Sequence, residues 1–244
     1  MTDLFERHDR VAFQFSGGRD SLAALYLLAL RWGEFTVYHI DSGDQFPETR
    51  AVVDRVAAQL PNFVRLRGDS QAIRFQYGMP SDVVPTGNTA FGRRVSGSPL
   101  LLQDRYDCCF RSVMLPMYQR MKADGVTAII RGVRKDDFKK APTEHGDVVD
   151  GFEFHYPIWD WSESDVMEFL EDSGVEPAPF YKHGLRETLE CVGCTAWWDN
   201  DRSRYMQRFH PKAYLRYADN LRRIKVAVQQ QMKTLDTELE VTHG

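Results

Sequence analysis

Short apolar runs separated by amphipathic stretches run through most of the chain, and this is the pattern of an α/β protein. Apolar runs predict strands at 11–15, 35–40, 63–66, 127–131 and 152–157. Strands that alternate with helices favour a parallel sheet covered by helices on both faces. The predicted fold class is therefore α/β with a parallel sheet.

Apolar residues at helical spacing predict the elements that cover this sheet. We expect helices at 22–30, 48–60 and 108–123, and another that starts after the N-cap Ser162 and ends at Gly174. Residues 68–104 mix Gly, Pro, Ser, Asn and Arg, which predicts a loop-rich insertion and a candidate lid.

Two further segments carry positive charge that could meet an anion. Within the predicted lid, Arg93 and Arg94 are candidates to contact a phosphate or sulfate, against the alternative that they are solvated. Residues 199–244 form a predicted helical, basic C-terminal segment. Aromatic residues are interleaved with its bases, so this segment is a candidate nucleic-acid contact, with a solvated helix face as the alternative.

Composition narrows the class of protein without naming a partner. The chain has 244 residues, 43% of them hydrophobic, a mean hydropathy of -0.45 and a net charge of -4. It has no apolar run near the ~18 residues of a membrane span. Its first residues lack the build of a signal peptide. We therefore expect a cytoplasmic protein with no membrane contact.

A glycine turn between the first strand and the first long helix is the strongest candidate site. Residues 15–21 read Phe-Ser-Gly-Gly-Arg-Asp-Ser. Backbone N–H groups at a helix N-terminus attract anions, and glycines let a phosphate approach closely. The turn lacks the Gly-Lys-Ser/Thr end of a Walker A loop.

This turn resembles the PP-loop of the adenine nucleotide α-hydrolase-like superfamily. The resemblance implies a Rossmann-like fold that binds ATP or an adenylyl sulfate and acts at the α-phosphate. It implies a catalytic role for Asp20, which could help hold Mg²⁺. The nucleotide-binding residues that it implies here are Phe15, Ser16, Gly17, Gly18, Arg19, Asp20 and Ser21.

Two later strand ends carry further candidates. The string from Asp41 to Thr49 resembles an element that follows the second strand in sulfonucleotide reductases and in the small subunit of ATP sulfurylase. It implies that Asp41, Ser42 and Gly43 lie near the adenosine.

The strand at 127–131 leads into Gly132 and two arginines. Because the carboxyl ends of parallel strands face the ligand crevice, Arg131 and Arg134 are candidate catalytic anion clamps. They also resemble the G-x-R element of the reductases, which adds Gly132 to the nucleotide site. The alternative is a surface turn of mixed charge.

The four cysteines fall into two pairs, Cys108-Cys109 and Cys191-x-x-Cys194. In a reducing compartment such pairs favour metal over disulfides. Geometry leaves an iron–sulfur cluster and zinc both open. The C-C and C-x-x-C order resembles the [4Fe-4S] pattern of assimilatory adenylylsulfate reductases, which implies a cluster held by all four cysteines. The resemblance covers about residues 11–198, so the predicted domains are 1–198 and 199–244.

Two departures from the reductases shape the predicted function. The reductases have a nucleophilic cysteine near the C-terminus that has no counterpart in this sequence. They also have a degraded PP-loop, whereas residues 16–21 of this sequence are the intact form. Both favour an enzyme that cleaves ATP to AMP and pyrophosphate and activates a tRNA- or DNA-type acceptor for sulfur transfer.

Two alternatives to this predicted function stay open, and each function implies its own partners. One is an APS or PAPS reductase that takes its thiol from a partner; the other is a non-catalytic nucleotide or redox sensor. The implied partners are an adenine nucleotide, a nucleic-acid acceptor and a protein that donates sulfur, a thiol or electrons.

Overall fold

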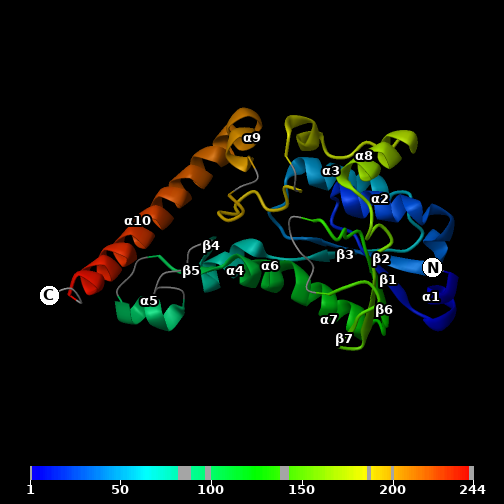
Figure 1. The fold of residues 1–244 in the computed structure, drawn as a ribbon, viewed down its shortest axis with the longest axis horizontal. Coiled ribbons are helices and arrows are strands. Elements are labelled where there is room, and N and C mark those ends of the chain that lie inside the picture. The colour runs from blue at the N-terminus through cyan, green and yellow to red at the C-terminus, as the bar shows by residue number, and fades with distance from the viewer. Residues whose placement is uncertain are drawn as a thin grey trace. The chain divides into compact units, whose positions relative to one another are not determined.

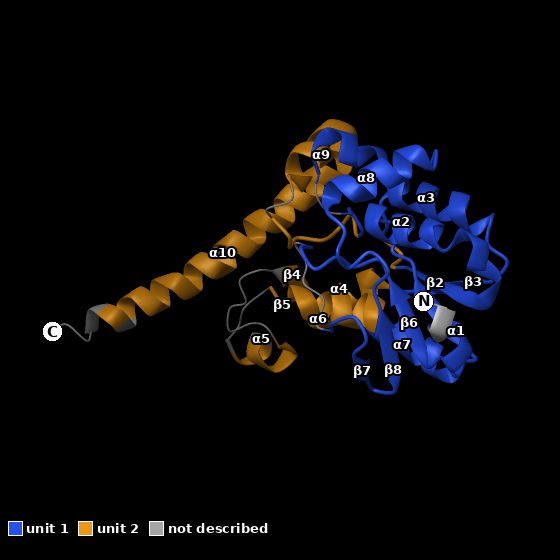
Figure 2. Ribbon diagram, turned by 45° about the vertical axis from the view of Figure 1, so that its right-hand side comes forward, with its two compact units in different colours: residues 1–41, 45–68, 115–190 blue, residues 42–44, 69–114, 191–244 orange. Residues whose placement is uncertain are grey.

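The computed structural model describes residues 2–81, 89–96, 100–137, 143–185, 188–198 and 201–241. Contacts divide the chain into two compact units, each assembled from several stretches (Figure 2). Unit 1 comprises residues 1–41, 45–68 and 115–190, and unit 2 comprises residues 42–44, 69–114 and 191–244. The predicted domain boundary at residue 198 stays a prediction.

Unit 1 is built on a sheet with strand order β3-β2-β1-β6-β8-β7 (Figure 1). Neighbouring strands in the described part run parallel, except that β7 is antiparallel to β8. The strands are β1 (Val11–Gln14), β2 (Phe35–Asp41), β3 (Phe63–Arg67), β6 (Ala128–Arg131), β7 (Val148–Val149) and β8 (Phe152–His155). The predicted α/β class is confirmed.

Helices cover both faces of this sheet, with α2, α3 and α8 on one side and α7 on the other (Figure 1). The helical elements of unit 1 are α1 (Thr2–Arg7), α2 (Arg19–Leu27), η1 (Ala29–Glu34), α3 (Pro47–Ala57), α7 (Leu115–Ala123), α8 (Glu163–Asp172) and η4 (Pro179–His183). The predicted cap of α8 is confirmed, because Ser162 and Asp165 form a reciprocal capping box.

The core of unit 1 explains why its central strands are apolar on both faces. In β1, Phe13 lies in register with Val37 of β2 and Ile130 of β6. All three side chains are fully buried. When helices cover both faces of a parallel sheet, neither side of a central strand meets solvent. The sequence of such a strand is therefore a continuous apolar run.

Unit 2 is mainly helical and contains a small two-stranded parallel sheet. Its elements are α4 (Ser70–Tyr77), β4 (Met79–Ser81), α5 (Ala90–Ser96), β5 (Leu102–Asp104), α6 (Arg105–Cys109), η3 (Phe110–Met114), α9 (Arg202–Phe209) and α10 (Pro211–Val241). Ile224 of α10 packs with Leu100 and Leu102. The predicted helical C-terminal segment is confirmed.

The loop-rich insertion expected at 68–104 is corrected by these elements. Asp69 accepts a hydrogen bond from Ala72 N at 2.8 Å and caps α4. Gly78, at φ +100°, ends that helix, and β4 follows at once. Capping and a positive-φ glycine therefore shape part of a segment whose composition resembles a loop. Arg94 is exposed on α5, whereas the side chain of Arg93 lies outside the described residues.

Candidate functional site

The glycine turn lies wholly within unit 1 and is closed by its own hydrogen bonds. Gly18 N donates to Ser16 Oγ at 3.2 Å, and Ser21 Oγ donates to Gly18 O at 3.0 Å. The two serine hydroxyls are 2.9 Å apart. Gly17 has φ +85°, which a residue with a Cβ rarely adopts. The turn before α2 is therefore organised without a ligand.

The strand order places this turn at the point where ligands bind in open α/β sheets. Strand β1 has β2 on one side and β6 on the other. The strands that follow β1 are therefore added first toward one edge of the sheet and then toward the other, and β1 lies at this switch point. The turn after β1 meets the loop after β6. A Cβ on Gly132 would lie 2.4 Å from Asp20 O and 2.5 Å from Ser21 Cα. Only glycine therefore lets the β6 loop approach the first turn of α2.

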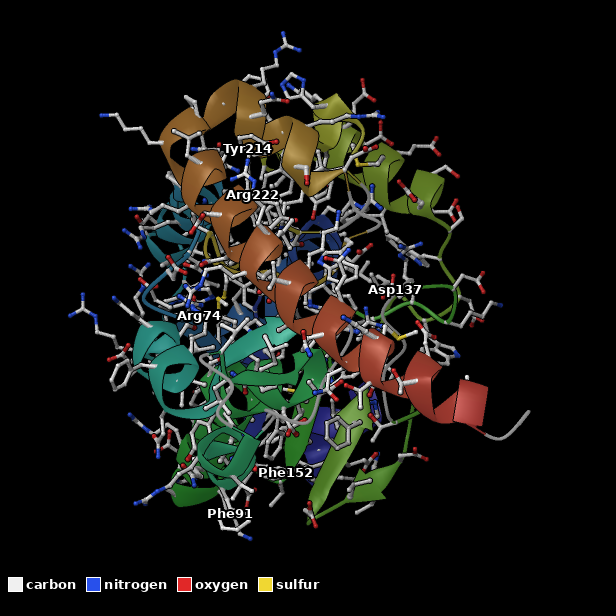
Figure 3. All side chains as sticks on the ribbon, turned by 90° about the vertical axis from the view of Figure 1, so that its left-hand side faces the viewer. Arg74, Phe91, Asp137, Phe152, Tyr214 and Arg222 are labelled. Carbon is white, nitrogen blue, oxygen red and sulfur yellow. The ribbon has the colours of Figure 1, made fainter. Side chains whose placement is uncertain are left out.

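Arg134 is the arginine that reaches the turn. Its Nε donates to Asp20 Oδ1 at 2.8 Å, and its Nη2 lies 2.8 Å from Asp137 Oδ1. Burial raises the pKa of Asp20, the nearby Asp137 charge adds to the rise, and Arg134 opposes it. Arg134, itself buried, thus holds two carboxylates beside the turn; Figure 3 labels Asp137.

Arg131 lies elsewhere, although both arginines are candidate anion clamps. Burial raises the pKa of Tyr118 on α7, and the charge of Arg131 partly opposes that rise. The Arg131 guanidinium is therefore close to Tyr118. Within the described residues its Nη1 is buried without a hydrogen-bond partner. The structure thus joins Arg134, but not Arg131, to the carboxylate of Asp20.

Tyr181 and Thr188 contact the turn, and the sequence patterns assigned them no site role. Tyr181 Oη accepts from Arg19 N at 3.2 Å and lies 2.8 Å from Thr188 Oγ1. A Cβ on Gly18 would lie only 2.1 Å from Thr188 Oγ1. Burial raises the pKa of Tyr181 to about 12, so the phenol stays neutral. A sequence signal for such contacts is weak because the residues are distant along the chain.

The ends of the turn are anchored by packing and by a buried histidine. Phe15 is buried, and its backbone N donates to Tyr38 O at 2.9 Å. His39 Nδ1 donates to Phe15 O at 2.8 Å. Arg19 is also buried and pairs with Glu163 Oε1 at 2.6 Å. Phe15 and Arg19 thus support the turn through the core and α8.

All four cysteines lie within unit 2. Cys108 and Cys109 end α6, and Cys191 and Cys194 lie in the loop before α9. Burial raises the pKa of Cys108 to about 12, and the charges of Cys194 and Cys191 add to the rise. Three of the thiols therefore influence one another electrostatically, and Cys108 is a protonated thiol near neutral pH.

A half-buried ion pair shapes the loop between Cys191 and Cys194. Arg74 Nη2 lies 2.6 Å from Asp44 Oδ2, which also accepts from Gly193 N at 2.9 Å. A Cβ on Gly193 would lie 2.7 Å from that same oxygen. The glycine in C-V-G-C is thus required by close approach to a carboxylate; Figure 3 labels Arg74. Arg202, also buried, donates to Cys194 O at 2.8 Å.

The predicted adenosine-contacting residues divide between the two units. Asp41 ends β2 in unit 1, with a carboxylate oxygen 3.7 Å from Arg50. Ser42 and Gly43 belong to unit 2, where Ser42 Oγ accepts from Cys191 Sγ at 3.4 Å. The structure thus brings Ser42 to the cysteines, and a nucleotide contact by these residues stays a prediction.

The cysteine site has suitable donors but no preformed metal geometry in the described chain. Among the described residues, no group of three or more His, Cys, Asp or Glu side chains is arranged to hold a metal ion. Metal-binding thiols must lose their protons, and neighbouring thiolates repel one another until a cation joins them. The pKa of Cys108 is raised first by burial and then by the charges of Cys194 and Cys191.

Comparison with known proteins gives one family and several distant relatives. Residues 10–197 match the family model "Phosphoadenosine phosphosulfate reductase domain". The chain is 24% identical over 198 residues to adenosine 5'-phosphosulfate reductase of Burkholderia cepacia, covering 80% of this chain and 73% of that one. It is 25% identical over 194 residues to sulfate adenylyltransferase subunit 2 of Mycobacterium sp. (strain JLS), covering 75% of this chain and only 62% of that one.

A solved structure supports the fold. Phosphoadenylyl-sulfate (PAPS) reductase from Candida auris, in a phosphate complex, aligns with a TM-score of 0.51 at 17% identity, covering 74% of this chain and 80% of that one. At this identity the likeness concerns the fold alone. In the described part of the chain, no helix is both long and apolar enough to cross a membrane.

Proposed function

From the premise that the chain belongs to the phosphoadenosine phosphosulfate reductase domain family, we propose that it is an adenine-nucleotide enzyme of sulfur metabolism that cleaves ATP to AMP and pyrophosphate. In this proposal, adenylylation of an acceptor oxygen prepares that position for replacement by sulfur. One relative named above reduces adenylyl sulfate and the other adenylylates sulfate, so adenylyl sulfate, as substrate or as product, unites them.

The observation that carries the proposal is the closed glycine turn beside the Asp20–Arg134–Asp137 cluster. Side chains pack so closely on Gly17 and Gly18 that a Cβ there would meet Val53 at 2.9 Å and Thr188 at 2.1 Å, so only glycine fits this turn. The N-terminus of α2 that follows is the kind of site that attracts a phosphate. Arg134, held between two carboxylates, supplies the positive charge that stabilises a phosphoryl transition state. Asp20 and Asp137 would hold Mg²⁺, since carboxylate oxygens are its usual protein ligands.

The proposed reaction needs only ATP and a hydroxyl or enol oxygen of the acceptor. That oxygen attacks the α-phosphorus and loses its proton, while the bond from the α-phosphorus to the β-bridging oxygen breaks and pyrophosphate leaves. A sulfur nucleophile then displaces AMP from the acceptor carbon. The turn's part is to place the α-phosphate in line with both oxygens.

The cysteines complete the proposal as ligands of a [4Fe-4S] cluster. Cys108, Cys109, Cys191 and Cys194 are the thiols that would hold it. A cluster would supply a place to bind and orient the sulfur that is transferred. The residues of unit 2 would position it through Asp44 and Arg74, which fix the loop around Gly193.

The second candidate is a sulfonucleotide reductase, favoured by the named relatives. All four cysteines of the sequence lie in the two pairs. In this candidate the thiol that attacks the sulfonucleotide comes from a partner protein, and the glycine turn binds the phosphate of APS or PAPS.

The products distinguish the two candidates. Protein purified without oxygen would be incubated with Mg²⁺ and ATP labelled at the α-phosphate, with bulk tRNA or DNA and a sulfide source. Release of AMP and pyrophosphate, lost in Asp20→Asn and kept in the exposed control Asp54→Asn, supports the proposal. Release of sulfite from APS or PAPS in the presence of thioredoxin and dithiothreitol, with ATP left intact, overturns it in favour of the reductase.

A further inference from the structure

An aromatic platform in unit 2 consists of the exposed Tyr106 and the half-buried Arg105 and Trp197. The rings of Tyr106 and Trp197 meet edge to face, with centroids 5.6 Å apart and an interplanar angle of 87°. The Arg105 guanidinium lies 4.2 Å from the Trp197 ring centroid and 5.1 Å from that of Tyr106. These three side chains are absent from the nucleotide turn and from the cysteine ligand set.

Tyr106 is the solvent-exposed member of the platform, and the loop that carries Trp197 is held in place by its neighbours. Tyr106 is 59% exposed, and the adjacent Trp198 is 42% exposed. Trp198 Nε1 donates to Thr195 O at 2.6 Å. Trp197 has φ +62°, a conformation that a bulky residue adopts only where its surroundings impose it. Two exposed aromatic residues, Tyr106 and Trp198, next to a tryptophan in this rare conformation indicate a binding role.

The platform lies close to the cysteine pairs along the chain. Arg105 and Tyr106 open α6, the helix that carries Cys108 and Cys109. Trp197 follows Cys194 by three residues. A flat group stacked on the platform would thus be presented next to the segments that carry all four thiols.

The same unit carries a long row of exposed positive charge. Between Arg202 and Lys233 the one acidic residue in the sequence is Asp219. The exposed bases of α9 and α10 are Arg204, Arg208, Lys212, Arg216, Arg222, Arg223, Lys225 and Lys233. Figure 3 labels Arg222 on α10. The nearby carboxylates of α6 have internal partners, since Asp104 caps the helix and Asp107 pairs with Arg111.

We propose that unit 2 binds single-stranded nucleic acid, with an unpaired nucleobase stacked on Arg105, Tyr106 and Trp197 and the phosphate backbone along the bases of α9 and α10. Aromatic rings and guanidinium planes stack on unpaired bases of any sequence, whereas a duplex hides these faces. The inference rests on the proposed function in one respect: it names an unpaired base as the sulfur acceptor.

Binding is tested by fluorescence anisotropy of labelled single-stranded RNA and DNA oligonucleotides and of a duplex of the same sequence, with the full chain and without ATP. Tyr106→Ala should weaken single-strand binding about ten-fold, because one stacked base contributes roughly that factor. Tyr106→Phe keeps the ring and should bind like the parent. The control Phe91→Ala removes an exposed aromatic of α5, labelled in Figure 3, and should also bind like the parent.

Salt dependence tests the charged part of the surface. Arg222→Gln/Arg223→Gln should lower the slope of log affinity against log salt by about 1.4, since each phosphate contact on a single strand contributes about 0.7. The proposal is overturned if Tyr106→Ala binds as tightly as Phe91→Ala, if the duplex binds as well as the single strands, or if only acidic peptides bind.

The two proposals fail in different ways. Gly18→Asp should abolish ATP binding and leave single-strand binding intact. Single-strand binding without release of AMP and pyrophosphate would refute the proposed function and keep this inference. Release of both products without Tyr106-dependent binding would do the reverse.

Discussion

The two candidate sites differ in how much of the chain each one needs. The glycine turn is seven consecutive residues, 15–21, with three hydrogen bonds inside the turn, and Arg134 and Tyr181 reach it from distant parts of the chain. The cysteine site needs residues 42–44, 70–74, 108–112 and 191–202, which are far apart in the sequence. The backbone of the turn is thus largely a local structure, whereas the four thiols are brought together by the tertiary fold.

The two sites also differ in how far their side chains are already arranged to bind a ligand. The turn and its carboxylate–arginine cluster are organised in the absence of ligand. At the other site Cys108 is protonated, because burial and its thiol neighbours raise its pKa. Binding of a cation at this site therefore has to displace the thiol protons and stabilise the thiolates. The comparison predicts that nucleotide binding and metal binding can be lost separately.

The largest expected effect comes from Gly18→Asp. The new Cβ would clash with Thr188 Oγ1, and its carboxylate would take the place of phosphate at the start of α2. We expect nucleotide affinity to fall at least about a hundred-fold, since two like charges would share a buried anion site. Isothermal titration calorimetry measures the loss, and iron content should not change.

Gly33→Asp is the matched control for this change. A Cβ at Gly33 meets nothing within 4 Å, so the same substitution in the same unit should leave affinity unchanged. Near-parent nucleotide affinity in Gly18→Asp would show that the turn is not the phosphate site.

The reciprocal change is Cys191→Ala/Cys194→Ala. Removing two of four thiolates should reduce the iron of anaerobically purified protein to background, as measured by a colorimetric iron assay and the visible absorption of the cluster. Nucleotide affinity should stay within about two-fold, because neither thiol takes part in the hydrogen bonds inside the glycine turn. Full iron content in this variant, with the exposed control Ser203→Ala for comparison, would remove the cluster from the account.

The third test compares Arg134 with Arg131. Arg134→Gln leaves Asp20 and Asp137 close together without their shared cation, so unfolding free energy should fall by about 3 kcal/mol. Nucleotide affinity should fall about ten-fold, as for the loss of one buried charge contact to phosphate. Arg131→Gln should cost less than about 1 kcal/mol and leave affinity unchanged.

Denaturant unfolding of Arg134→Gln and Arg131→Gln measures the loss of stability, and calorimetry measures the loss of nucleotide affinity. Asp20→Asn added to Arg134→Gln should recover part of the stability, because it removes one of the unpaired carboxylates. Equal effects of the two arginine substitutions on nucleotide affinity would contradict the separation that the structure shows.

The smallest expected effect is a pH dependence of unit 1 through His39. Burial lowers the pKa of His39, and the hydrogen bonds to Phe15 O and Gln45 only partly oppose that fall, so the folded chain favours the neutral imidazole. The unfolded chain therefore takes up a proton below about pH 6.5 that the folded chain refuses. Stability should fall as pH drops from that value toward the folded pKa, by up to about 1.4 kcal/mol per pH unit.

His39→Gln keeps a donor for Phe15 O and does not titrate, so it should flatten this part of the curve. His183→Gln, which changes an exposed histidine, should keep the parent slope. Thermal unfolding across pH 5 to 7 measures the difference, and identical slopes in the two variants would refute the role of His39.

Much of unit 1 could be predicted from the sequence because its signals are local. The β1 run, the Ser16–Ser21 turn and the Ser162 cap each depend on residues that are neighbours in the chain. Gly132 was assigned to the nucleotide site by resemblance, and the structure supplies the reason, since a Cβ there would overlap the backbone of Asp20.

The remainder depends on contacts that no local pattern reports. Tyr181 and Thr188 reach the turn from more than a hundred and fifty residues away in the chain. Arg131 and Arg134 look equivalent in the sequence. Arg131 is the last residue of β6 and lies near Tyr118, whereas Arg134 lies in the loop that follows and pairs with Asp20. The 70–104 segment reads as a loop because Gly, Pro and Ser are frequent in it, although Asp69 and Gly78 delimit a helix there.

The central claim, that the intact turn binds ATP for cleavage at the α-phosphate, is tested most directly by one titration. ATP–Mg²⁺, APS and PAPS would be titrated by calorimetry into protein purified without oxygen, with Gly18→Asp as the blank. We expect a clear preference for ATP–Mg²⁺ over both sulfonucleotides. Clear preference for APS or PAPS would contradict it and identify the turn as the site of a sulfonucleotide reductase whose thiol comes from another protein.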